Sequence, residues 1–217
     1  MNNALQKCVV SWYRKLYRKI RKTVLKKRIL SIPTIISNDC CGGVIYKNLG
    51  LEFQSPTIKL YVDNNDFILL CNHIEYFLTG VLNECINDMH SYPVGQLTCD
   101  KGTITLYFIH YKSFEEAKEC WERRIKRVKL DNIFFLFNAG PNISNDILEL
   151  YANIRCKKVL LSSGANCEKY GFCKNLKCYE KGFKGPLVKY RFKFGVKRYL
   201  DEYNWMEIFE KNIMEGN

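Results

Sequence analysis

The chain has 217 residues, 47% hydrophobic and 26% charged, a composition that excludes a disordered protein and suits one hydrophobic core. Its net charge of +12 comes almost entirely from residues 1–32, which hold ten Lys and Arg residues and no acidic residue. Because the other residues are nearly neutral, the charge pattern disfavours a nucleic-acid-binding domain.

Residues 1–32 are predicted to form a basic amphipathic helical arm. Its apolar residues recur every three or four positions and share one helical face, namely Leu5, Val9, Trp12, Leu16, Ile20 and Val24. Such a helix suits an anionic membrane surface. It equally suits packing of the apolar stripe on the domain or on a second subunit of a homo-oligomer, so the partner stays open.

Residues 33–217 are predicted to form one α/β domain, because apolar runs of strand length alternate with helical patterns. The expected strands are Thr34 to Ser37, Thr57 to Val62, Thr103 to Tyr111, Asn132 to Asn138 and Lys157 to Ser162. The expected helices are Gly43 to Leu49, Asn65 to Leu82, Ser113 to Val128, Ser144 to Asn153 and Tyr203 to Ile213. Nearly continuous apolar strands favour a three-layer α/β/α fold with a mostly parallel sheet.

Two segments depart from this alternation. Asp100-Lys101-Gly102 is a turn signal between two short extended runs and predicts an inserted antiparallel hairpin. Beyond Ser163 we expect a long irregular connection with an edge strand at Leu187 to Phe194.

The eleven cysteines are an odd number without a disulfide framework. Charges interrupt the first apolar residues, so we expect no secretory signal, and no run of about 18 apolar residues indicates a membrane span. The sequence therefore predicts reduced thiols in a cytoplasmic protein.

Four predicted strand exits are unusually polar, and a parallel sheet would bring them to one edge, where ligands bind. They begin at Ser37, Asp63, His110 and Asn138. We expect ligand contacts from Asn138 and from the first exit, through Ser37, Asn38, Asp39, Cys40, Gly42 and Gly43. The glycines would let backbone amides approach a phosphate or carboxylate. By themselves they indicate only a tight turn into a helix, since no GxGxxG or GxxxxGK motif is present.

Candidate reactive groups are few. Cys40 or Cys41, beside a helix start, could be a nucleophile with a lowered pKa, although paired cysteines are more often small buried hydrophobes. His110 is the best candidate general base, with Tyr111 and Lys112 next to it. Arg123 or Arg124 on the following helix could clamp an anion, unless both are merely solvated. No metal site is predicted, because the cysteines lack CxxC spacing, and the cofactor stays unknown.

Several motifs in order, among them TIISNDCCGGVIYKNLGLEFQSPTI, YPVG, IHYKSFEEAKECWERRIKRVKLDNIFF and VKRYLDEYNW, resemble the bacterial domain-of-unknown-function family 1919. The resemblance runs from about Pro33 to Ile208. It implies recurring positions at Ser37, Asn38, Cys40, Gly42, Gly43, Tyr92, Pro93, Gly95, His110, Tyr111, Lys112, Trp121, Glu122, Arg123 and Arg124. FNAGPNIS, after the fourth strand, is neutral where the family pattern is more acidic.

The resemblance implies a role in exopolysaccharide or capsule biosynthesis. We therefore expect a cytoplasmic protein, at the inner face of the membrane, that transfers an acyl or glycosyl group on a glycan or nucleotide-sugar precursor. In that scheme His110 activates an acceptor hydroxyl. The alternative is a non-catalytic partner of a biosynthetic complex, with a shallow crevice and His110 inside the core. Nucleic-acid binding through the basic arm is disfavoured.

Overall fold

The computed structural model describes residues 3–85 and 90–210, and the described chain contains two separate sheets. The larger sheet is parallel, with strand order β1-β5-β6-β7. Its strands are β1 (Thr34–Ser37), β5 (Ile133–Asn138), β6 (Lys157–Ser162) and β7 (Cys173–Asn175). The smaller sheet is antiparallel and consists of β2 (Val81–Cys85), β3 (Val94–Cys99) and β4 (Gly102–Tyr107).

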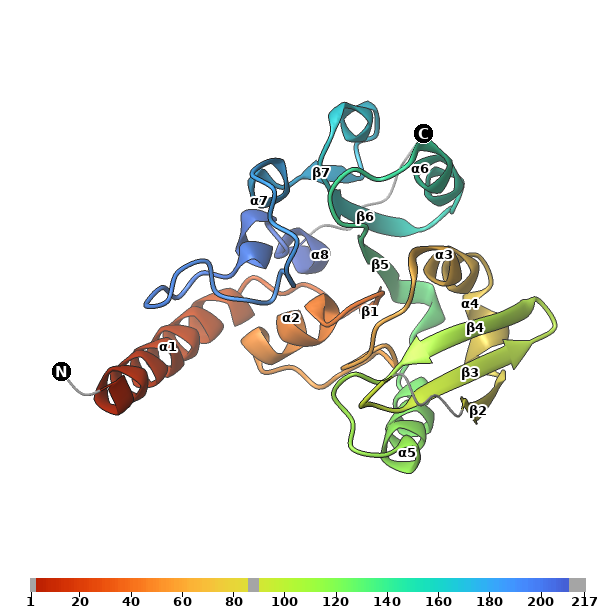
Figure 1. Cartoon of the computed structure of the whole chain (residues 1–217), viewed down its shortest axis with the longest axis horizontal. Helices are drawn as coiled ribbons and strands as arrows, with labels where there is room; N and C mark the ends of the chain where they lie inside the picture. Colours follow the sequence, from red (N-terminus) through yellow and green to blue (C-terminus); the bar gives the residue numbers. More distant parts are fainter. Residues whose placement is uncertain (1–2, 86–89, 211–217) are drawn as a thin grey trace.

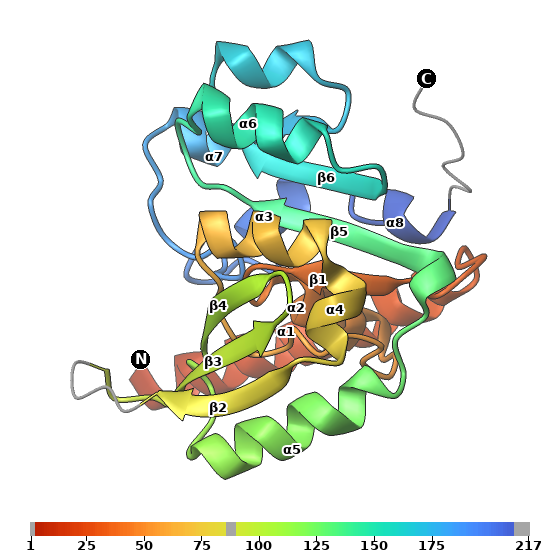
Figure 2. The same ribbon diagram turned by 90° about the vertical axis from the view of Figure 1, so that its right-hand side faces the viewer.

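Helices cover both faces of the parallel sheet (Figure 1). The α-helices are α1 (Asn3–Lys26), α2 (Cys41–Leu49), α3 (Asn64–Asn72), α4 (Ile74–Leu78), α5 (Phe114–Ile125), α6 (Asn145–Ala152), α7 (Lys177–Glu180) and α8 (Glu207–Glu210). Short 3₁₀ helices are η1 (Leu130–Asn132), η2 (Ala165–Lys169) and η3 (Tyr199–Glu202). Figure 2 shows α3 between β5 and the antiparallel sheet, with α5 on the far side of that sheet.

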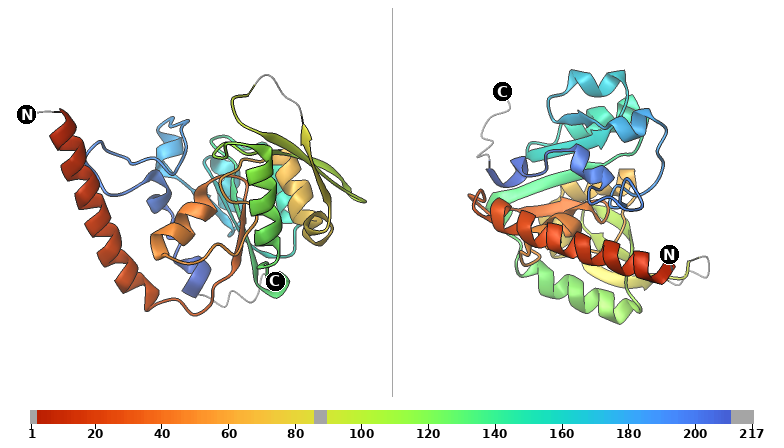
Figure 3. Two further views of the ribbon diagram at one scale, coloured as in Figure 1. Left: turned by 90° about the horizontal axis from the view of Figure 1, so that it is seen from below. Right: turned by 90° about the vertical axis from the view of Figure 1, so that its left-hand side faces the viewer.

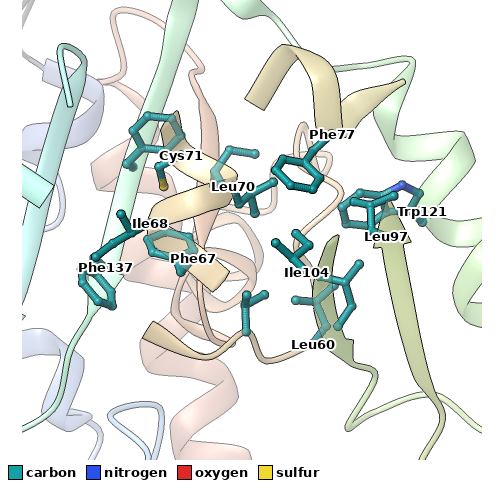
Figure 4. Packing of buried hydrophobic residues seen from close by; sticks show 14 of the residues in the cluster. Leu60, Phe67, Ile68, Leu70, Cys71, Phe77, Leu97, Ile104, Trp121 and Phe137 are labelled. Atoms are coloured by element: carbon teal, nitrogen blue, oxygen red, sulfur yellow. The ribbon is translucent and has the colours of Figure 1, made fainter. Parts of the chain in front are cut away.

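The side chains of the parallel strands alternate between two hydrophobic cores, as the pleat of a strand requires. Phe135 and Phe137 of β5 point into the core shared with α3 and the antiparallel sheet. Phe134 and Leu136 point into the other core, which contains α2 and Trp205. Figure 4 shows the first core, where the rings of Phe67 and Phe137 lie 5.1 Å apart between centroids.

The structure confirms the mixed α/β fold, the parallel sheet covered by helices and the N-terminal helix. The predicted strands at Thr34, Asn132 and Lys157 agree with β1, β5 and β6 to within one residue. Two of the predicted helix starts, at Ser113 and Ser144, are N-caps in the structure. The hydroxyls of Ser113 and Ser144 accept backbone N–H groups at the first turns of α5 and α6.

Between residues 57 and 85 the predicted elements are wrong in part. No strand forms at Thr57 to Val62, where only Tyr61 makes an isolated bridge, to Tyr107. The predicted helix from Asn65 to Leu82 divides into α3 and α4 at His73, whose φ of −133° is not helical, and it ends at Leu78. Gly80 then passes close under β3, since a Cβ there would lie 2.7 Å from the carbonyl oxygen of Thr98.

The inserted antiparallel element is larger than the predicted hairpin, because β2 joins β3 and β4 in a sheet of its own. The predicted strand from Thr103 ends at Tyr107, and the chain turns there, with Tyr111 N–H donating to the carbonyl of Phe108. No edge strand forms at Leu187 to Phe194, where Tyr190 makes only an isolated bridge, to Arg198. The last predicted helix, Tyr203 to Ile213, is wrong at its start, because α8 begins only at Glu207. Its residues 211–213 lie outside the described residues.

One pair of cysteines is joined. Cys167 in η2 and Cys173 at the start of β7 form a disulfide. The prediction that all eleven cysteines are reduced thiols is therefore wrong for this pair.

The arm is a single helix, α1, that lies along one edge of the molecule (Figure 3). Its predicted apolar stripe is exposed, so the interpretation that this stripe packs on the domain is wrong. Leu25, Arg14 and Arg21 make the contacts with the domain instead. Among the described residues, no helix combines the length and the hydrophobicity needed to cross a bilayer.

Candidate functional site

A cavity of about 740 Å³ lies where β1 and β5 end. Other parts of its wall come from Tyr61 and the start of α3, from Tyr92, from the turn after β4 and from the segment between α7 and η3. The lining residues are Asp39, Cys40, Tyr61, Asn64, Tyr92, Ile109, His110, Asn138, Ala139, Gly140, Pro141, Tyr179, Lys184, Gly185, Pro186, Val188 and Lys189. The size is typical of small-molecule sites.

Asp39 is held in one orientation at the end of β1. Its Oδ1 accepts the backbone N–H of Cys41 at 2.8 Å, and its Oδ2 accepts the Nδ2–H of Asn138 at 2.8 Å. The Cys41 thiol also lies 3.3 Å from Oδ2. A carboxylate fixed by donors on both oxygens presents its remaining lone pairs to the cavity without reorganising.

Asn138 connects Asp39 to the other strand ends. The backbone N–H and carbonyl of Asn138 pair with the side chain of Asn38, at 2.9 and 3.0 Å, which locks β5 against β1. The hydroxyl of Tyr179 donates to Asn138 Oδ1 at 2.5 Å. This network spans β1, β5 and α7, so it fixes three sides of the cavity at once.

The two thiols beside Asp39 are not activated. Burial, followed by the negative charge of Asp39, raises the pKa of Cys40 to about 12. Burial and Asp39 likewise raise the pKa of Cys41 well above its ordinary value. The hypothesis of a nucleophile with a lowered pKa is therefore wrong for both residues, because a thiolate is disfavoured here.

Aromatic side chains form one wall of the cavity. Tyr61 and Tyr92 line it, and the His90 ring stacks on Tyr92 at 4.9 Å between centroids. Tyr107 lies behind, 5.9 Å from Tyr61 and 5.7 Å from His90. Burial, then the charge and hydrogen bond of Asp63, raise the pKa of Tyr61 to about 12, so its phenol stays protonated at neutral pH.

Two lysines supply positive charge to the cavity lining. Lys184 and Lys189 lie on the loop between α7 and η3. Leu187 between them is fully buried, and its carbonyl accepts the N–H of Leu200 at 2.9 Å. The loop is therefore anchored to the core beneath α2, and its lysines stay next to the cavity.

The predicted site residues divide into three groups. Asp39, Cys40, His110 and Asn138 line the cavity, and His110 is exposed there. Ser37, Asn38, Gly42 and Gly43 belong to the scaffold beneath it. The amide of Gly42 donates to Ser37 Oγ at 3.2 Å, and a Cβ at Gly43 would meet Ile58, so neither glycine lines the cavity.

Tyr111, Lys112, Arg123 and Arg124 lie on or next to α5, apart from the cavity lining. Arg124 is only 5% exposed, and its guanidinium donates to the Tyr111 hydroxyl at 2.5 Å. Tyr111 in turn donates to the carbonyl of Ile58 at 2.9 Å. This pair fastens α5 to the loop that follows α2, which is a structural role.

Sequence reasoning missed the aromatic wall and the basic loop. Tyr61 lies two residues before Asp63, and Tyr92 is one of the positions implied by the family resemblance, so both could have been found. Lys184 and Lys189 flank Gly185-Pro186, but nothing local predicts that their loop folds back to β1 and β5. Within residues 3–85 and 90–210, no three His, Cys, Asp or Glu side chains gather so as to hold a metal ion.

Comparison with known proteins places the chain in a family. The family model described as a domain of unknown function, DUF1919, matches residues 12–210, so the chain belongs to this family. An uncharacterized protein of Haemophilus influenzae (strain ATCC 51907 / DSM 11121 / KW20 / Rd) is 28% identical over 191 residues. That match covers 88% of this chain and 90% of the relative.

Proposed function

We propose that this member of the DUF1919 family is a transferase that acts on a glycan precursor in exopolysaccharide or capsule biosynthesis. The observation that carries the proposal is the composition of the cavity. A fixed carboxylate, a wall of tyrosines and two lysines surround one space of about 740 Å³. These are the three kinds of group that an activated sugar would contact.

Each group suits a different part of such a ligand. Asp39 accepts hydrogen bonds from sugar hydroxyls, and its own donors hold it in place. Tyr61 and Tyr92 offer ring faces on which the apolar face of a sugar packs. Lys184 and Lys189 neutralise a phosphate or diphosphate, for which lysine is a common ligand.

His110 is the residue we assign as general base. It is exposed on the cavity wall, so it can reach an acceptor that enters from solvent. The imidazole takes the proton of the acceptor hydroxyl, and the acceptor oxygen forms a bond to the donor carbon. The bond from that carbon to its leaving group breaks, and the leaving group departs with the electron pair next to the lysines.

The proposed setting is the cytoplasm at the inner face of the membrane. The polysaccharide context rests on the family resemblance of the sequence motifs, whereas the cavity supports only the class of ligand. The neutral loop from Asn138 to Pro141 lines the cavity where the family pattern is more acidic. We therefore place no catalytic carboxylate on that loop.

The alternative of a non-catalytic partner predicts a shallow crevice with His110 inside the core. The roomy cavity and the exposed imidazole support the transferase over this alternative.

The test is a turnover assay with the full chain. Nucleotide sugars or acetyl-coenzyme A are offered as donors, with a polyprenyl phosphate or an oligosaccharide as acceptor, and products are identified by mass spectrometry. We expect one donor class to give a product. His110→Ala should lower the rate by at least about a hundredfold, as loss of general-base catalysis does.

The matched control is His73→Ala, which removes a histidine from the junction of α3 and α4. It should leave the rate within about twofold. A folded His110→Ala protein with an unchanged rate would refute the assignment of the base. A donor that binds in the cavity without any turnover would point to the non-catalytic partner.

A further inference from the structure

The apolar stripe of α1 faces solvent along the whole helix. Leu5, Val9, Trp12, Leu16, Ile20 and Val24 are each between 40% and 64% exposed. They recur every three or four residues and so share one face. An exposed apolar surface of this extent marks an interaction site in a water-soluble protein.

The opposite face of α1 is attached to the domain by its arginines. Arg14 Nε donates to the carbonyl of Gly195 at 2.8 Å, and its guanidinium lies 3.5 Å over the Tyr190 ring. Arg21 pairs with Asp201 at 2.8 Å and lies over Trp205. The helix therefore cannot roll its stripe onto the domain without breaking these contacts.

Lysines follow one flank of the stripe. Lys15, Lys19 and Lys26 are exposed and spaced by four and seven residues, which places them in one row beside the apolar face. Lys22, between them in the sequence, is half-buried with its ammonium end next to Gly50 of the domain. Residues 1–32 contain ten basic residues and no acidic one. The arginines that hold α1 thus face the domain, whereas Lys15, Lys19 and Lys26 accompany the exposed apolar side chains.

Charge complementarity selects the occupant of this surface. A second copy of the chain would bring one basic, acid-free helix against another and leave like charges facing each other. An anionic bilayer offers both partners that the helix lacks, namely apolar acyl chains for the stripe and phosphate headgroups for the lysine row.

We propose that α1 docks in the plane of an anionic lipid bilayer, with its apolar stripe inserted and its lysine row at the headgroups. The turn that Arg14 holds carries two further exposed apolar side chains, Phe192 and Phe194, next to the helix. The docking is rigid, because Arg14 and Arg21 fix the helix on the domain. This inference deepens the membrane location in the proposed function, but its test needs no turnover, so the two can fail separately.

The experiment is co-sedimentation of the full chain with phosphatidylglycerol-containing vesicles and with pure phosphatidylcholine vesicles, followed by tryptophan fluorescence. Trp121 and Trp205 are 2% and 1% exposed, whereas Trp12 is 64% exposed, so a spectral change on binding reports Trp12. We expect binding to the anionic vesicles, a blue shift of emission and protection of Trp12 from an aqueous quencher. Trp12→Phe should bind but lose the shift.

Two double variants separate the contribution of the apolar stripe to membrane binding from that of the lysines. Leu16→Gln with Ile20→Gln removes apolar residues of the stripe, and Lys15→Gln with Lys19→Gln removes basic residues; each should weaken partitioning by at least about tenfold. Leu150→Gln, which changes a side chain of α6 that is 51% exposed, is the matched apolar control and should bind normally. Lys112→Gln with Lys126→Gln, at the two ends of α5, is the charge control.

Three results would overturn the inference. The full chain could ignore anionic vesicles, or the Leu16 and Ile20 variant could bind them as well as the wild type. The chain could also run as a dimer that the same variant dissociates, in which case a second copy covers the stripe.

Discussion

Asp39 is the residue on which the chemistry of the cavity depends most. It receives Cys41 N–H and Asn138 Nδ2–H, and its charge acts on the neighbouring thiols and on Tyr61 and Tyr179. One carboxylate thus orders the strand ends, and its charge adds to burial, the larger cause, in raising the pKa of four weak acids. A sequence pattern can show that an Asp follows a strand, but not that its two oxygens are already occupied.

Neutralising Asp39 should change the reactivity of Cys40 in a defined direction. In Asp39→Asn the pKa of Cys40 should fall below its value of about 12, because the charge is gone, yet stay above the ordinary value, because burial is the larger cause. The measurement is the rate of Cys40 alkylation as a function of pH, in a protein whose other accessible cysteines have been replaced by serine. Asp131→Asn, on η1, is the control and should leave the profile unchanged; an identical profile for Asp39→Asn would contradict the coupling.

Arg124 and Arg123 are adjacent in sequence and differ in role. Arg124→Ala should lower the free energy of unfolding by about 2 kcal/mol, since it removes the bond to Tyr111 and the packing over Phe53. Arg123→Ala, at an exposed position, should change it by less than about 0.5 kcal/mol. Urea denaturation of both variants measures the difference. Equal effects would mean that Arg124 does not act as a structural clamp.

Among the elements, α2 shows why a glycine pair need not bind a ligand. A Cβ at Gly42 would lie 2.7 Å from Ser37 Oγ and 3.3 Å from Ile35, whereas a Cβ at Gly43 would meet only Ile58, at 3.3 Å or more. Gly42 therefore lets α2 approach β1 closely, and Gly43 is less restricted.

The same substitution at these two positions should give different results. Gly42→Ala should destabilise the fold by about 1–3 kcal/mol, the usual cost of overpacking a core. Gly43→Ala should be close to neutral, because the gain in helix propensity of up to about 1 kcal/mol offsets a mild contact. Thermal unfolding of both variants measures this difference. A similar loss of stability in the two variants would contradict it.

The attachment of α1 should depend on pH through Asp201. Burial would raise the pKa of this carboxyl, but hydrogen bonds from Arg21, the Arg198 backbone and Trp205 hold it below its ordinary value. Because the pKa of Asp201 is lower in the folded state, its charged form stabilises the fold at pH values above the unfolded-state pKa of about 3.9. This stabilisation is lost as the pH falls through the folded-state pKa. The protection of α1 against hydrogen exchange, measured relative to the intrinsic rate at each pH, should therefore fall below about pH 4. Asp201→Asn should exchange fast already at pH 6, and a slow variant would contradict the role of this ion pair.

At the scale of the whole molecule, local patterns predicted the parallel sheet and the β3-β4 hairpin, but not β2 or the separation of the antiparallel strands into a second sheet. β1, β5 and β6 are short runs of buried residues, and Ser113 and Ser144 mark helix starts by capping chemistry. β2 has only Leu82 buried, and its register comes from pairing with β3, so the local pattern resembled a continuing helix. Tertiary pairing decided its structure.

From the sequence, only the part of the cavity that lies at the ends of parallel strands could be predicted. Asp39 and Asn138 follow β1 and β5, and parallel strands bring such ends together. His110 reaches the same cavity from a turn after β4, which ends at Tyr107 in a separate sheet, whereas the prediction placed His110 at the exit of a strand in the parallel sheet. Lys184 and Lys189 depend on the burial of Leu187 in a distant core, a contact that no short pattern contains.

The most direct test of the account is a thermal-shift titration of the full chain with nucleotide sugars, acetyl-coenzyme A and a polyprenyl phosphate. A ligand at 100 times its Kd should stabilise the fold by about 2.7 kcal/mol. We predict a clear shift with a phosphorylated sugar or lipid donor. Lys184→Gln with Lys189→Gln should abolish this shift, whereas Lys112→Gln with Lys126→Gln should leave it intact. A well-folded protein that shifts with none of these ligands, or whose shift survives loss of both cavity lysines, would contradict the claim that this cavity is the binding site.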